Sequence, residues 1–149
     1  MTDITAEVST TIEATPARVW TALTDPHLIE QYFMGARAES DWKVGSPITW
    51  SGTWKGKAYQ DKGEILEFDP SRRLRFSHWS PMGGTADAPE NYHVVDFILD
   101  SRENEPPTKV TLTQSNLDGE VTDADRSSRS DYESNWSSVL DGLKRVVED

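Results

Sequence analysis

The sequence predicts an α+β fold in which a curved antiparallel sheet of seven strands carries one long C-terminal helix across its concave face. Three observations predict it: an amphipathic segment at the C-terminus, a series of segments of alternating polarity before it, and two helix-start signals after the first of these. A chain of 149 residues builds one core, so we expect a single domain over residues 1–149.

The C-terminal segment, residues 130–147, has the pattern of a helix with one apolar face. Its apolar residues fall within an arc of about 120° on a helical wheel; they are Tyr132, Trp136, Val139, Leu140, Leu143, Val146 and Val147. Ser130 and Glu133 have the spacing of a capping box, and Lys144 and Arg145 lie in the last turn. Such a helix needs a large apolar surface to lie on.

The N-terminal part predicts one strand and two short helices. Residues 4–12 alternate in polarity, which is typical of a half-buried strand. Thr15-Pro16 and Asp25-Pro26 are both N-cap and proline pairs, so we expect one helix from Pro16 and a second over residues 27–32.

The middle of the chain predicts six more strands. They cover residues 37–42, 46–54, 58–68 (with a bulge near Gly63), 74–79, 92–100 and 108–114. Residues 80–91, which include Gly83-Gly84, are expected to form a loop, and residues 115–125 a polar connection to the last helix. The late strands are apolar on one face, as in a sheet that is covered on one side.

Composition excludes several partners. The net charge of −11 argues against nucleic acids and anionic membranes, which bind basic surfaces. The absence of cysteine, of a signal peptide pattern and of an apolar run of about 20 residues leads us to expect a cytoplasmic protein without membrane association.

Four segments resemble one known family. They are residues 14–26 (ATPARVWTALTDP), residues 63–70 leading to Arg73-Leu74, residues 109–114, and the last helix from Trp136 through Leu140 to Leu143. They are similar to the START-like, birch-pollen-allergen-like superfamily, in the branch of homologues of the activator of the heat-shock-protein-90 ATPase. The resemblance implies the helix-grip fold and a cavity for hydrophobic ligands between sheet and helix.

Side chains alternate between the two faces of a strand, and the C-terminal helix has one apolar face. Together these two patterns place a set of large side chains in that space. The candidate ligand-binding residues are Trp50, Trp54, Ile65, Phe76, His78, Phe97, Leu112, Gln114, Tyr132, Trp136 and Leu140, with Phe33 and Met34 at the cavity mouth. The alternative is that these residues simply fill the core. Glu64 and Asp96 fall on the other face and are expected in solvent, and Gly142 is expected to leave room for a sheet side chain or a ligand.

Catalytic and metal-binding motifs are not evident. His27, His78 and His93 match no zinc spacing, and there is no phosphate loop, dinucleotide fingerprint or nucleophile elbow, so we expect no metal and no cofactor. We expect binding of a small hydrophobic or aromatic ligand. One alternative is a co-chaperone-like interaction module, with a chaperone or a second copy of the chain as partner. The other is a cavity enzyme of cyclase or hydrolase type, which rests on His78 alone, without an identified partner.

Overall fold

The computed structural model describes residues 4–33, 35–81 and 84–148, with the exception of the Trp54 side chain. The strands are β1 (Ile4–Ile12), β2 (Arg37–Ser40), β3 (Pro47–Trp54), β4 (Lys57–Asp69), β5 (Arg73–His78), β6 (His93–Ser101) and β7 (Thr108–Asn116). The helices are α1 (Pro16–Thr24), α2 (Pro26–Tyr32) and α3 (Asp123–Glu148), with 3-10 turns at Pro89–Asn91 and Arg102–Asn104.

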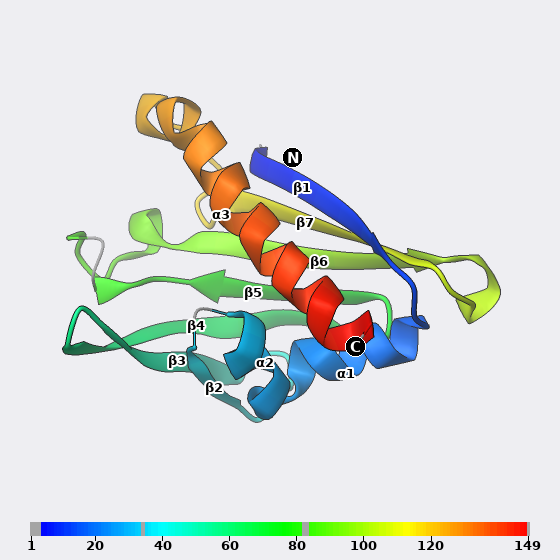
Figure 1. Cartoon of the computed structure of the whole chain (residues 1–149). Coiled ribbons are helices and arrows are strands. Elements are labelled where there is room, and N and C mark those ends of the chain that lie inside the picture. The colour runs from blue at the N-terminus through cyan, green and yellow to red at the C-terminus, as the bar shows by residue number, and fades with distance from the viewer. Residues whose placement is uncertain (1–3, 34, 82–83, 149) are drawn as a thin grey trace.

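The seven strands form one antiparallel sheet in the order β1-β7-β6-β5-β4-β3-β2, which confirms the predicted fold class. Figure 1 shows α3 lying diagonally across this sheet, with α1 and α2 beside its C-terminal end. Asp25 explains why α1 and α2 are separate, because its extended backbone ends α1 while its carboxylate accepts the His27 N–H and begins α2.

The last helix begins earlier than expected, at Asp123 rather than at Ser130. The Asp125 N–H donates to the Thr122 hydroxyl at 3.1 Å, and the Thr122 N–H donates to the Asp125 carboxylate at 2.9 Å. This reciprocal pair is a capping box, which satisfies two backbone donors at the helix start. The apolar stripe does not extend into these first turns, which Figure 1 shows in orange beyond the start of β1.

Charged side chains of α3 also cover the free edge of β1. Carboxylates of Glu133 and Glu148 accept the backbone N–H groups of Glu7 and Glu13, at 3.0 and 2.8 Å. Lys144 donates to the carbonyl oxygen of Thr11. Because an open strand edge pairs readily with other strands, these contacts protect β1 from association with another chain.

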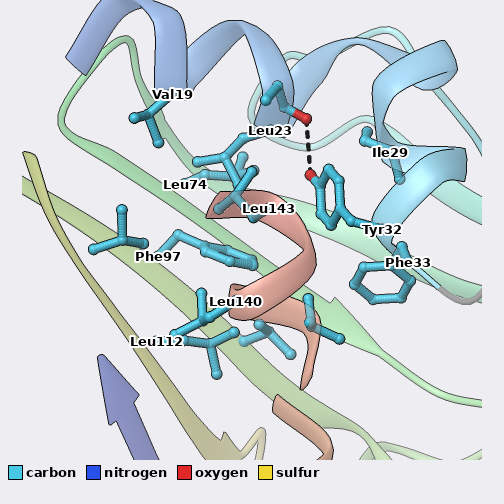
Figure 2. Packing of buried hydrophobic residues seen from close by; sticks show 14 of the residues in the cluster. Val19, Leu23, Ile29, Tyr32, Phe33, Leu74, Phe97, Leu112, Leu140 and Leu143 are labelled. Carbon is cyan, nitrogen blue, oxygen red and sulfur yellow. Dashed lines mark hydrogen bonds between the residues drawn. The ribbon is translucent and has the colours of Figure 1, made fainter. Parts of the chain in front are cut away.

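The space beside Gly142 is occupied by α2, and not by a sheet side chain or a ligand. A methyl group at this position would lie 2.9 Å from the Cβ of Tyr32. Tyr32 is buried and donates its hydroxyl hydrogen to the carbonyl oxygen of Ala22 at 2.8 Å (Figure 2). Burial raises the pKa of the Tyr32 phenol, which therefore remains a hydrogen-bond donor. The absent side chain lets α2 approach α3 closely.

Asp96 corrects one expectation about the outer face of the sheet. Glu64 is exposed, as expected, but Asp96 is only 7% exposed. The Arg73 guanidinium covers Asp96 with two hydrogen bonds, Nε to Oδ1 at 2.9 Å and Nη2 to Oδ2 at 2.5 Å. A paired carboxylate can be buried on the solvent side of a sheet, whereas an unpaired one cannot.

Candidate functional site

The predicted site residues that the structure describes come together where the sheet faces α3. Ile65, Phe76, Phe97, Leu112 and Leu140 are buried there together with Trp50, Gln114 and Trp136, while His78 and Tyr132 are partly exposed at the edge. Met34 and the side chain of Trp54 lie outside the described part of the structure.

The core of this region is almost filled, which corrects the expectation of a ready-made gap of ligand size. The void among the described residues has a volume of about 20 Å³ and is lined by Leu23, Ile29, Tyr32, Phe33, Trp42, Ile48, Trp50, Leu74, Phe76 and Phe97. This volume holds about one water molecule. The ring of Phe33 is one of the side chains that fill this region, and its centroid lies 6.3 Å from that of Trp50 and 5.9 Å from that of Trp136.

A row of polar side chains crosses the same face at one end of the core. Cross-strand pairing places Asp61 beside Trp50, His78 beside His93, and His93 beside Asn116. Nε2 of His78 lies 3.0 Å from Oδ2 of Asp61, and the two side chains are 20% and 15% exposed. The Trp50 ring packs 5.0 Å from the His78 ring. The other carboxylate oxygen of Asp61 is buried without a hydrogen-bond partner among the described residues.

The first turns of α3 close the other end of this row. Asn116 donates to Asp125 at 2.7 Å, and the ring of Tyr132 packs 6.0 Å from that of His93. Burial and repulsion by His78 lower the pKa of His93, although Asp125 acts in the opposite direction. The neutral form of His93 is therefore favoured at pH 7, with one ring nitrogen as donor and the other as acceptor.

Gln114 carries a donor with a fixed orientation. The indole N–H of Trp136 donates to Oε1 of Gln114 at 2.7 Å, which identifies the amide oxygen and leaves Nε2 on the other side. Nε2 is buried and has no acceptor among the described residues. Such a group costs about 1–3 kcal/mol when it has no partner. The Gln114 amide can therefore bind an acceptor such as a carbonyl oxygen.

Asp125 makes the stability of the protein dependent on pH in the acid range. Burial alone would raise its pKa, but hydrogen bonds from Thr122 and Asn116 hold the pKa of Asp125 below the usual value of 3.8. Its carboxylate therefore stabilises the fold above that value and loses this contribution as the pH falls through the lowered pKa. We expect Asp125→Asn to reduce the free energy of unfolding by about 1–2 kcal/mol at pH 7 and by less at pH 3.

Urea unfolding between pH 7 and pH 3 measures this difference. Asp123→Asn is the matched control, because Asp123 lies in the same turn with its side chain fully exposed. Its effect should stay within about 0.5 kcal/mol at every pH. An effect of Asp125→Asn that is equally large at both ends of the range would contradict the assignment.

Sequence reasoning missed Asp61, His93, Asn116 and Asp125 as members of this row. The signal for two of them was available, because Asp61 has the strand parity of Ile65, and His93 has the parity of Val95 and Phe97. Asp125 could not be found in this way, since it reaches the row from a helix turn that was expected to be a loop.

Larger hollows lie on the outside of the molecule. One of about 490 Å³ lies on the other face of β4 and β5 and is lined by residues that include Glu64, Ser77 and Leu117. Three of its polar groups bind one another, since Asp87 accepts from both Lys62 and Tyr92. We place the candidate site on the concave face, where the unpartnered atoms of Asp61 and Gln114 lie beside aromatic rings; the third such atom among the described residues, Nε of Arg75, lies on the outer face.

The described residues form neither a metal-binding cluster nor a membrane-spanning helix. No three or more of their His, Asp and Glu side chains are grouped as a metal ion would require. None of the helices they form is both long and apolar enough to cross a membrane.

Comparisons with known proteins agree with this fold. A protein from Cytophaga hutchinsonii with a solution structure is 44% identical, with 96% of this chain and 92% of that chain covered and a TM-score of 0.77. A crystal structure from Mesorhizobium loti is 23% identical over 95% and 96% of the chains, with a TM-score of 0.70. The Aha1 dimer from Colwellia psychrerythraea, solved in solution, is 22% identical over 96% and 95% of the chains, with a TM-score of 0.68.

No functionally curated protein matches the chain. A family model does match, over residues 13–148, which is nearly the whole sequence and includes all elements from α1 to α3. The chain therefore belongs to the family described as activator of Hsp90 ATPase homolog 1-like proteins.

Proposed function

We propose that this protein binds a small, uncharged aromatic molecule between the concave face of the sheet and α3. The single observation that carries the proposal is the buried Nε2 of Gln114, which is held in place by Trp136 and has no acceptor among the described residues. A ligand carbonyl or hydroxyl oxygen would satisfy this donor, and the neighbouring aromatic rings would contact the ligand ring.

The charges around the site favour a neutral ligand over an anion. Asp61 and Asp125 flank the polar row, and the whole chain carries a net charge of −11. An anion placed in the buried site would also lose its hydration. The unpartnered oxygen of Asp61 lies on β4, with β5 and β6 between it and Gln114 on β7, so a one-ring ligand bound at Gln114 needs an acceptor and no donor.

Acetophenone is a suitable probe, because it combines one aromatic ring with one carbonyl acceptor. We expect it to bind with a dissociation constant below about 1 mM, measured by isothermal titration calorimetry. Gln114→Met keeps the length of the side chain but removes the donor Nε2 together with the oxygen that accepts from Trp136, and it should weaken binding by about tenfold. Ethylbenzene, which has the same ring and a two-carbon side chain without the carbonyl oxygen, should bind both proteins alike.

Gln60→Met is the matched control, since Gln60 is also on the sheet but exposed. It should leave the affinity for acetophenone unchanged. The proposal fails if the wild-type protein does not bind acetophenone, or if Gln114→Met binds it as tightly as the wild type does.

Family membership is consistent with either a ligand-binding protein or a co-chaperone-like module. The second role would be favoured by a contiguous apolar patch on the surface. Among the described residues, the large hydrophobic side chains that are exposed are Ile4, Val44, Ile98 and Leu117, which are too few for a patch of that kind. We therefore do not propose a protein partner.

A further inference from the structure

We infer that the side chain of Phe33 occupies the position of the ligand ring and leaves it when the ligand binds. The inference rests on the proposed function, and it explains how a ligand can enter a core that is already filled. It also defines the ligand class, because a planar ring of about the size of phenyl is what the vacated position accepts.

The surroundings of Phe33 are those of a bound aromatic ring. Its ring is stacked on Trp50 with an interplanar angle of 14° and is tilted against Trp136 by 57°. Stacked and tilted pairs at 4.5–7 Å are the favourable arrangements of aromatic rings. Trp136, against which the ring is tilted, also donates to Oε1 of Gln114, so Gln114 with its unpartnered Nε2 contacts a side chain that borders the ring position.

Only the side chain of Phe33 has to move, because its backbone is held at the end of α2 by hydrogen bonds with Ile29 and Ala36. Phe33 is the C-cap residue of α2, with φ −106° and ψ 59°, and is therefore outside the regular helix. The side chain of its neighbour Tyr32 is fixed by the hydrogen bond to Ala22 and by packing against α3. The side chain of Phe33 is 6% exposed and contacts the core through its aromatic ring (Figure 2).

Departure of the ring would leave a space of ligand size. Phe33 lines the void of about 20 Å³, so the volume of a phenyl group would be added to that void. Apolar cavities of about 150 Å³ in proteins hold benzene. The wild-type protein binds its ligand less tightly than a protein with a free site would, because the buried ring must first be displaced.

Phe33→Ala tests the inference. We expect it to bind acetophenone at least about tenfold more tightly than the wild-type protein does, by isothermal titration calorimetry. The matched control is Phe68→Ala, because Phe68 packs edge-on against Trp20, at 5.1 Å, away from Trp50 and Trp136. The control should stay within about twofold of the wild-type affinity.

Nuclear magnetic resonance of the wild-type protein gives a second measurement that does not depend on the stability of the variant. The ring protons of Phe33 should have chemical shifts displaced by the ring currents of Trp50 and Trp136 in the free protein, and should move to the values of an exposed ring as acetophenone is added. Phe33→Leu, which loses less volume, should show a smaller gain in affinity than Phe33→Ala.

The outcomes separate this inference from the proposed function. If the wild-type protein binds acetophenone but Phe33→Ala gains no affinity, or if the Phe33 resonances do not move, the inference is overturned and the proposed function stands. If neither protein binds, both are overturned.

Discussion

Gly63→Ala should destabilise the protein by about 3 kcal/mol or more, which is a large part of the stability of a domain of this size. A Cβ atom on Gly63 would lie 1.7 Å from the carbonyl oxygen of Ser77 and 2.5 Å from its carbonyl carbon. Because these atoms belong to the backbone of β5, no rotation of a side chain can relieve the overlap. The strands β4 and β5 would have to separate.

The contacts on both sides of Gly63 would separate with it. The Glu64 N–H donates to the Ser77 hydroxyl at 3.0 Å, and Lys62 and Trp79 exchange backbone hydrogen bonds at 3.0 and 2.8 Å. The same part of the ladder places Asp61 against His78. Loss of the close approach should therefore also disturb the polar row of the candidate site.

Gly52→Ala is the matched control in the neighbouring strand. A Cβ on Gly52 would lie 2.6 Å from the hydroxyl oxygen of Tyr59, which is the far end of a flexible side chain that can turn away. Its effect should stay within about 1 kcal/mol. Urea unfolding measures both variants, and similar values for the two would contradict the steric explanation.

The strands and their faces could be predicted from the sequence, because alternation is a local property. His78 shares a face with Leu74 and Phe76 as expected, and Asp25-Pro26 separates the two short helices as expected. The size of the void could not be predicted in this way. It depends on where α2 rests on α3, and hence on the fit of Tyr32 against Gly142, which are 110 residues apart.

For the polar residues of the site, too, the sequence predicts the face of the sheet but not the side-chain partner. The face of Asp61 follows from strand parity, but its contact with His78 depends on the close approach at Gly63. Asp96 was expected in solvent because parity places it on the outer face, and parity does not indicate that Arg73 covers it. Side-chain partners from other strands therefore decide burial where hydrophobic patterns do not.

Leu143→Ala should reduce the free energy of unfolding by about 2–5 kcal/mol, because it removes a fully buried side chain from the face by which α3 holds the sheet. Leu143 is 0% exposed, and Figure 2 shows it pointing from α3 into the cluster that also contains Leu23 and Leu74. The cavity left behind is surrounded by helices and sheet alike, so its lining cannot easily collapse.

Ser137→Ala is the control on the exposed side of the same helix. It should change the stability by no more than about 0.5 kcal/mol, since alanine is a good helix former and no contact with the core is lost. Thermal and urea unfolding compare the two variants. If Leu143→Ala were as stable as Ser137→Ala, the side chains of α3 would not hold the sheet, and a ligand site between them would lose its support.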